Sequence, residues 1–141
     1  MKNQFILNPS VEFIEETAKV YSTPNGYVSI HANDIYSIMN GASNALLLES
    51  IEASGSDRTD KIINDIKSFF SVADSYNINN AENMIISIEY PANDELTIDE
   101  VENIINAISN ITSSTGVIWG ANPVDRNTIN LKLIATNLKK A

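Results

Sequence analysis

The sequence of 141 residues contains no cysteine, one histidine and two arginines, and each shortage excludes a class of site. Without cysteine the chain forms no disulfide, no thiolate metal site and no cysteine nucleophile. One histidine, His31, cannot build a metal site of several imidazoles, and we expect it to be a polar surface residue. Two arginines are few for a pocket that clamps a polyanion. We therefore predict no metal site.

Basic charge is also scarce, because 18 acidic residues accompany 9 basic ones and the net charge is −9. Nucleic-acid binding relies on clustered Lys and Arg, so no nucleic-acid partner is expected. The acid surplus favours solubility and a basic face on a protein partner. No apolar run approaches the roughly 20 residues that span a bilayer, and residues 1–8 are too short an apolar stretch for a signal peptide. We expect a soluble, cytoplasmic protein without membrane attachment.

The chain does have enough apolar residues, 43%, to form one globular domain of ordinary size. Residues 4–7 predict a strand, and Asn8-Pro9 predicts a helix start with Asn8 as the cap. Apolar residues recur at helical spacing up to Tyr21, and the turn 22–26 ends that helix. A short strand at 27–30 and a short helix from Asp34 to about Gly41 follow.

The middle of the chain predicts one helix between two strands. Residues 45–53 suit a buried strand, although their length also suits a continued helix. Residues 54–58 supply a turn and a cap for the next helix. Its core face is expected to carry Ile62, Ile63, Ile66, Phe69 and Phe70. After a polar loop at 74–80, apolar residues alternate over 84–90, which predicts a strand with one dry face and one wetter face.

The last third begins with Thr97-x-x-Glu100, a capping box, followed by a helix with Ile98, Val101, Ile105 and Ile108 as its apolar stripe. Two further strands, at 117–119 and 129–136, are expected to form a hairpin around the turn 122–127. We expect Trp119 to pack in the core or on the sheet surface. Together these elements predict an α+β fold, a two-layer sandwich with helices mainly on one face of a mixed four- to five-stranded sheet.

Several short motifs in this order resemble the C-terminal domain of the FtsZ/tubulin family. The family shows a "DLT-x-x-E" helix start, a strand ending in Trp/Phe-Gly, an acidic turn and a final strand closing on Ile-Ala-Thr. The corresponding residues here are Glu95-Leu96-Thr97 with Glu100, Trp119-Gly120, Asp125 and Ile134-Ala135-Thr136. The resemblance covers about residues 27–138. It implies an FtsZ C-terminal-like domain at 27–141, favours a strand at 45–53, and leaves 1–26 as an added strand and helix.

The resemblance also assigns a degraded site. The family's synergy loop, Asn-x-Asp-x-x-Asp, corresponds to Ser29, His31 and Asp34, so only the last acid is retained. We expect Asp34 to act as a helix cap. The family's Gly-rich phosphate loop has no counterpart, because the glycines are dispersed. The chain is therefore expected to bind no GTP and no cofactor, and to be no enzyme.

Three functions remain open, of which the first is preferred. The protein is a non-catalytic interaction or assembly module that self-associates or binds a protein partner, associated with cell division or the cytoskeleton. Its candidate interaction surface comprises Tyr27, Tyr36, Asp125 and Arg126. Alternatively, it modulates an FtsZ-type GTPase by supplying Asp34 in trans. The third alternative is a small-molecule enzyme with its site at an oligomer cleft, because a fold does not fix a function.

Overall fold

Five strands form one mixed sheet in the computed structural model, which describes residues 3–23, 26, 28–71, 76–112 and 116–140. In spatial order they are β1 (Asn3–Leu7), β2 (Asn44–Ala53), β6 (Ile129–Thr136), β4 (Asn83–Pro91) and β5 (Gly116–Val124). Strands β4 and β5 run parallel, whereas the other neighbouring pairs are antiparallel. The α+β class and the mixed five-stranded sheet are confirmed.

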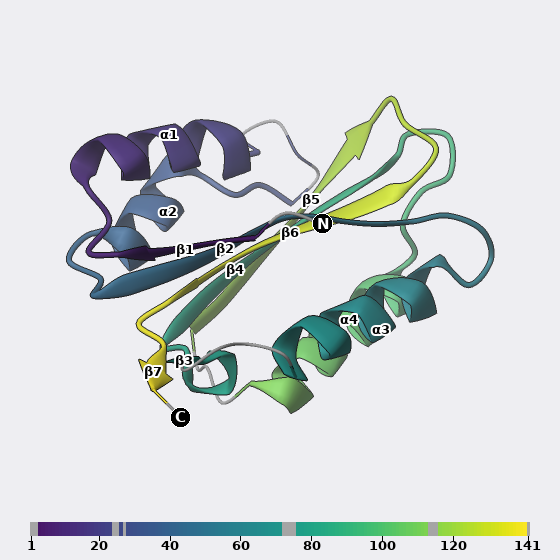
Figure 1. The fold of residues 1–141 in the computed structure, drawn as a ribbon. Coiled ribbons are helices and arrows are strands. Elements are labelled where there is room, and N and C mark those ends of the chain that lie inside the picture. Colours follow the sequence, from purple (N-terminus) through teal and green to yellow (C-terminus); the bar gives the residue numbers. More distant parts are fainter. Residues whose placement is uncertain (1–2, 24–25, 27, 72–75, 113–115, 141) are drawn as a thin grey trace.

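A pair of helices covers each face of the sheet (Figure 1). On one face lie α1 (Val11–Tyr21) and α2 (Ala32–Met39), and on the other lie α3 (Arg58–Ser71) and α4 (Ile98–Ile111). The predicted two-layer arrangement with helices mainly on one face is corrected, because α1 and α2 form a third layer on the other face of the sheet. Their buried side chains, including Ile14 and Ile35, form a core of their own against the sheet.

The two cores share the central strands. On β4, Met84, Ile86 and Ile88 belong to the core beneath α3 and α4, whereas Ile85 belongs to the core beneath α1 and α2. The predicted wetter face of β4 is mostly buried, since Ile85 is 0% and Ser87 1% exposed. Glu89 on that face is partly exposed, at 13% of its side chain, where it lies near Lys132 and Arg126.

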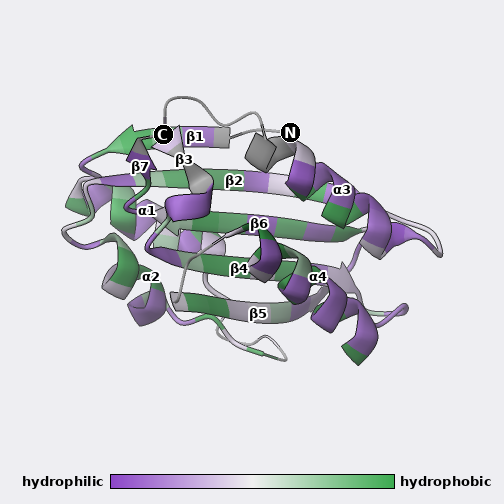
Figure 2. Cartoon of the chain, turned by 90° about the horizontal axis from the view of Figure 1, so that it is seen from below, coloured by the Kyte–Doolittle hydropathy of each residue, from purple (hydrophilic) through white to green (hydrophobic). Residues whose placement is uncertain are grey.

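The predicted hairpin between the last two strands is also wrong. Strand β6 pairs with β2 and β4 and occupies the centre of the sheet, while β5 pairs with β4 at the edge. Figure 2 shows the sheet from the α3 and α4 side, with β1 and β5 at its two edges. A small second sheet joins β3 (Tyr76–Asn77) to β7 (Lys139–Lys140). The predicted polar loop thus contains β3 and a short 3₁₀ turn (Ile78–Asn80).

Several predicted element boundaries are corrected by hydrogen bonding. Asn8 has a left-handed backbone (φ 48°), and the Ser10 hydroxyl instead caps α1 by accepting from the Phe13 N–H at 3.1 Å. Helix α2 begins at Ala32 and ends at Met39, before Gly41. On α4, the predicted apolar stripe is wrong at Ile98, which is 78% exposed.

No helix in the described part of the chain is long and apolar enough to cross a membrane. The predicted strand at 27–30 is reduced to an isolated bridge between Val28 and Ala121, and Tyr27 lies outside the described residues. The side chains of Phe69 and Phe70 likewise lie outside the description.

Candidate functional site

The predicted site at the start of α2 is a local structure of that helix. His31 is the N-cap residue, and its backbone N–H donates to the Asp34 carboxylate at 2.8 Å. Asp34 is therefore the third helical residue and is not the N-cap, which corrects the predicted position while keeping a capping role. The Ser29 hydroxyl donates to the Gly26 carbonyl at 3.2 Å and so closes a turn upstream. These contacts tie each side chain to its own segment.

No group of three or more metal-ligating side chains gathers among the described residues, here or elsewhere. The Asp34 carboxylate stabilises the start of α2 in two ways. Its negative charge lies near the positive end of the helix dipole, and it accepts a hydrogen bond from a backbone N–H that has no partner within the helix. The bond from the His31 N–H favours this structural role for Asp34.

The segment before α2 lies against the edge strand β5. Val28 and Ala121 exchange two backbone hydrogen bonds, at 3.1 and 2.9 Å. A Cβ atom at Gly120 would lie 2.6 Å from Ile30 Cγ1 and 2.7 Å from the Val28 carbonyl oxygen. Only glycine permits this close approach. Gly120 and the bridge between Val28 and Ala121 therefore hold the segment before α2 against the sheet.

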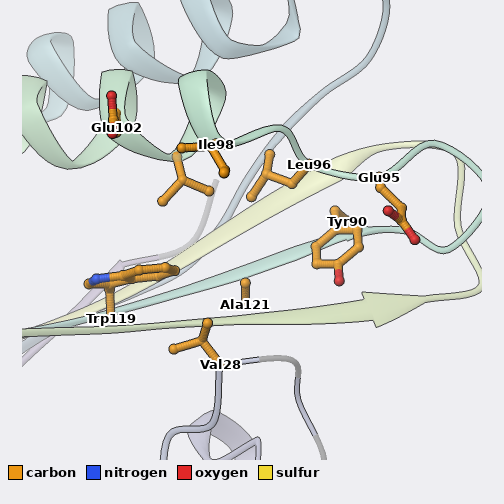
Figure 3. Close-up of a pocket in the computed structure, with 9 residues that line it drawn as sticks. Val28, Tyr90, Glu95, Leu96, Ile98, Glu102, Trp119 and Ala121 are labelled. Atoms are coloured by element: carbon orange, nitrogen blue, oxygen red, sulfur yellow. The ribbon is translucent and has the colours of Figure 1, made fainter.

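An open pocket of about 460 Å³ lies next to this segment, between α4 and β5. Figure 3 shows Trp119, Ala121 and Val28 on one side of it and Leu96 and Ile98 on the other. Most of its lining is aliphatic or aromatic, namely Val28, Tyr90, Leu96, Ile98, Val101 and Trp119. The charged residues that line it are both acidic, Glu95 and Glu102. A pocket of this size and character is typical of binding sites.

The start of α4 forms one wall of the pocket and is held by a capping box. The Thr97 hydroxyl accepts from the Glu100 N–H at 3.1 Å, and the Thr97 N–H donates to the Glu100 carboxylate at 3.1 Å. This confirms the predicted Thr97-x-x-Glu100 motif. Because Ile98 directly follows the cap, its side chain stands at the mouth of the pocket, where it is 78% exposed.

A buried arginine fastens this wall to α3. Arg58 is 5% exposed, and its Nε and Nη2 atoms donate to the two carboxylate oxygens of Glu100 at 2.7 and 2.8 Å. Its guanidinium also donates to the carbonyl oxygens of Asp94 and Glu95, at 3.1 and 3.0 Å. Thr59 donates to Glu100 at 2.9 Å. Arg58 thereby holds the loop that leads into α4.

This arrangement shifts the pKa of the two partners. The hydrogen bonds from Arg58 lower the pKa of Glu100 to about 2, against the opposing effect of burial. The same hydrogen bonding raises the pKa of Arg58. The sequence predicted Glu100 as part of a capping box but missed its pairing with Arg58. The position of Arg58 at the end of the turn 54–58 was the available signal, and its partner lies 42 residues further along the chain.

The residues predicted as an interaction surface occupy different parts of the structure. Tyr36 lies on α2, where it lines a pocket of about 310 Å³ with residues of α1. Asp125 and Arg126 lie in the connection between β5 and β6. Arg126 has Glu89 at 3.6 Å and Glu52 at 3.9 Å. Their role in binding stays a prediction.

Comparisons with known proteins identify the fold. No protein-family model matches the sequence, and no curated protein matches it either. An FtsZ dimer from M. jannaschii is similar in structure, with a TM-score of 0.64 and 21% identity over 81% of this chain and 33% of that chain. A mutant of the M. jannaschii FtsZ gives a TM-score of 0.66 and 18% identity over 93% of this chain and 42% of that chain.

A protofilament structure of TubZ from Bacillus thuringiensis serovar israelensis gives a TM-score of 0.66 and 12% identity, over 84% of this chain and 30% of that chain. The chain thus spans between 30% and 42% of the length of these solved chains. At such identities the likeness concerns the fold. The protein has a fold like that of the FtsZ/tubulin C-terminal domain.

Proposed function

We propose that the protein is a non-catalytic protein-interaction module, which binds a protein partner through the pocket between α4 and β5. The observation that carries the proposal is the pocket itself, about 460 Å³ and mostly apolar, with Ile98 at its mouth 78% exposed. A large apolar side chain left in water next to such a cavity is typical of an interaction site.

Two further features support this function. Arg58, 5% exposed and bonded to Glu100 at both carboxylate oxygens, holds the α4 wall rigidly, which lowers the entropy cost of binding. The similar FtsZ and TubZ structures are described as a dimer and as protofilaments, which supports a role in assembly. An association with cell division or the cytoskeleton is part of the same proposal and rests on these likenesses of fold.

Asp34 gives less support to the alternative of a GTPase modulator. Its carboxylate accepts from the His31 N–H at 2.8 Å, so a role in trans would require this bond to open or to be shared. We therefore prefer a non-catalytic module to one that supplies a catalytic acid.

Site-specific photocrosslinking tests the proposal. A photoreactive phenylalanine analogue replaces Ile98 at the mouth of the pocket, and the protein is irradiated in the cells that produce it. The matched control places the analogue at Val20, which is also an exposed aliphatic residue on a helix, 57% exposed, but belongs to α1. We expect a discrete protein adduct from position 98 that is absent from position 20. Equal labelling at both positions, or none at 98, would refute the pocket as a binding site.

A direct measurement confirms any adduct. Trp119 lines the pocket and is the only tryptophan of the chain, so its fluorescence reports on this site alone. Addition of the purified adduct protein is expected to shift the Trp119 emission saturably, and Ile98→Ser to weaken the effect while Val20→Ser does not.

A further inference from the structure

The two edges of the sheet are protected to different degrees. At the β5 edge, Val28 bonds to Ala121, and Pro123 lies within the strand. At the opposite edge, β1 pairs with β2 alone among the described strands, in an uninterrupted register from Asn3 to Leu7. It carries no bulge, proline or charged residue. Proteins normally protect an edge strand with one of these devices, because an open edge pairs with another chain.

Two of the exposed apolar side chains lie on β1, where Phe5 is 38% exposed and Leu7 59%. A third, Val11, is 67% exposed at the start of α1. No charged residue occurs between positions 3 and 11, although the whole chain carries 18 acidic and 9 basic residues. Two copies of a chain with net charge −9 repel each other, so an uncharged stretch is where they meet at the lowest electrostatic cost.

The hydrogen-bond pattern shows which backbone groups of β1 face outward. The Asn8 N–H donates to the Ser43 carbonyl at 2.9 Å, which continues the β1 and β2 register. In an antiparallel pair, alternate residues point their N–H and C=O groups toward the neighbouring strand. Since Asn8 points inward, the backbones of Leu7, Phe5 and Asn3 point away from the sheet.

We propose that β1 pairs antiparallel with β1 of a second copy across a two-fold axis, in a register centred on Phe5. In this register Phe5 lies opposite Phe5 of the partner subunit, and Leu7 lies opposite Asn3 of the partner subunit. All of these residues have outward-facing backbones, so each opposed pair exchanges two hydrogen bonds. The strand is self-complementary, as a two-fold interface requires, and the two five-stranded sheets become continuous.

The side chains also suit this contact. The Phe5 ring packs on Tyr76 with centroids 4.6 Å apart, so the two Phe5 rings meet beside two tyrosines. Aromatic pairs opposite each other on neighbouring strands stabilise a sheet. A strand of 5 residues is about 17 Å long, which places the contact among small interfaces. We therefore expect a dimer that dissociates at micromolar concentrations.

This dimer rests on the proposed role in assembly and names β1 as the surface through which two copies associate. The β1 edge is separate from the pocket, which lies at the opposite edge of the sheet. Failure of the dimer therefore leaves photocrosslinking at position 98 unchanged, and failure of the pocket leaves the dimer intact.

Sedimentation equilibrium of the full chain tests the proposal between about 5 and 500 µM, a range suited to micromolar dissociation constants. The wild type is expected to double its mass as the concentration rises. Phe5→Lys and Phe5→Glu should each remain monomeric, because like charges then stand directly opposite each other. An equimolar mixture of the two variants should associate again, since position 5 opposes itself only in this register.

Val20→Lys is the matched control, because it changes a similarly exposed aliphatic residue outside β1 and should dimerise as the wild type does. Circular dichroism and Trp119 fluorescence confirm that each variant is folded. Three results would overturn the proposal. The wild type could stay monomeric at every concentration, or its mass could exceed that of two copies. The mixture of the two variants could also stay monomeric while the wild type dimerises.

Discussion

The ion pair between Arg58 and Glu100 is expected to be a large contributor to the stability of the fold. Glu100→Gln keeps the size of the side chain and one hydrogen-bond acceptor, but removes the charge that faces a guanidinium only 5% exposed. The folded protein holds the pKa of Glu100 at about 2 instead of the usual 4.5. At about 1.4 kcal/mol per pKa unit, the carboxylate contributes roughly 3 kcal/mol to the free energy of unfolding at pH 7.

The sign of the pH dependence follows from the direction of the shift. Because the folded pKa of this acid is lowered, its contribution is complete above about pH 4.5 and is lost as the pH falls toward 2. We expect Glu100→Gln to lower the free energy of unfolding by about 3 kcal/mol at pH 7, or the melting temperature by about 10 °C. The difference from the wild type should shrink steadily between pH 4.5 and pH 2.

Urea unfolding followed by Trp119 fluorescence and circular dichroism measures this difference at each pH. Glu102→Gln is the control, because Glu102 is an exposed acid on the same helix and none of the described ion pairs includes it. A loss below about 1 kcal/mol at pH 7, or one that does not change with pH, would refute the reasoning, because a buried pair costs more than that to break.

Three further predictions concern the α1 and α2 side of the sheet. Deletion of residues 1–22 should yield an insoluble or strongly destabilised protein, because α1 covers a buried core. A truncated protein with the same melting temperature as the full chain would show that this segment does not shield the core. Gly120→Ala should lower the free energy of unfolding by about 1–3 kcal/mol in urea titrations, because its Cβ overlaps the Val28 carbonyl oxygen. Asp34→Ala should cost about 1 kcal/mol through the lost bond to His31, and a far larger loss in thermal melts would point to contacts beyond this cap.

Local patterns in the sequence predicted local structure well. The Thr97-x-x-Glu100 capping box is confirmed because both bonds join residues three apart, which no distant segment alters. The helix after Arg58 is confirmed as α3. The strand at 45–53 is confirmed as β2, although its apolar residues left strand and helix open and the family resemblance favoured the strand.

Long-range placement could not be predicted in the same way. The turn at 122–127 favoured a hairpin between β5 and β6. The position of β6 is decided instead by its side chains, which are buried on both faces of the sheet. Leu133 and Ile134, adjacent in sequence, are each 0% exposed, one in each core, so β6 must be central. The unbroken apolar run from Leu133 to Ala135 was the available signal, since central strands lack strict alternation.

The pocket between α4 and β5 could not be predicted because its walls come from separate parts of the chain. Val28, Tyr90, Ile98 and Trp119 meet only after β5 has paired with β4 and α4 has packed above them. Each of these residue types, taken alone in the sequence, is as compatible with the core as with the surface. The ion pair between Arg58 and Glu100 was missed for the same reason.

The central position of β6 has a consequence for how the protein reaches its native state. Residues 129–136 separate β2 from β4, so neither half of the sheet can join the other until this segment arrives. Its contacts with β2 span about 80 residues, and such distant pairings form late and slowly. Until then β2 and β4 each present an open apolar edge to other chains. We therefore expect the five-stranded sheet to form in one cooperative step, without a populated half-formed sheet.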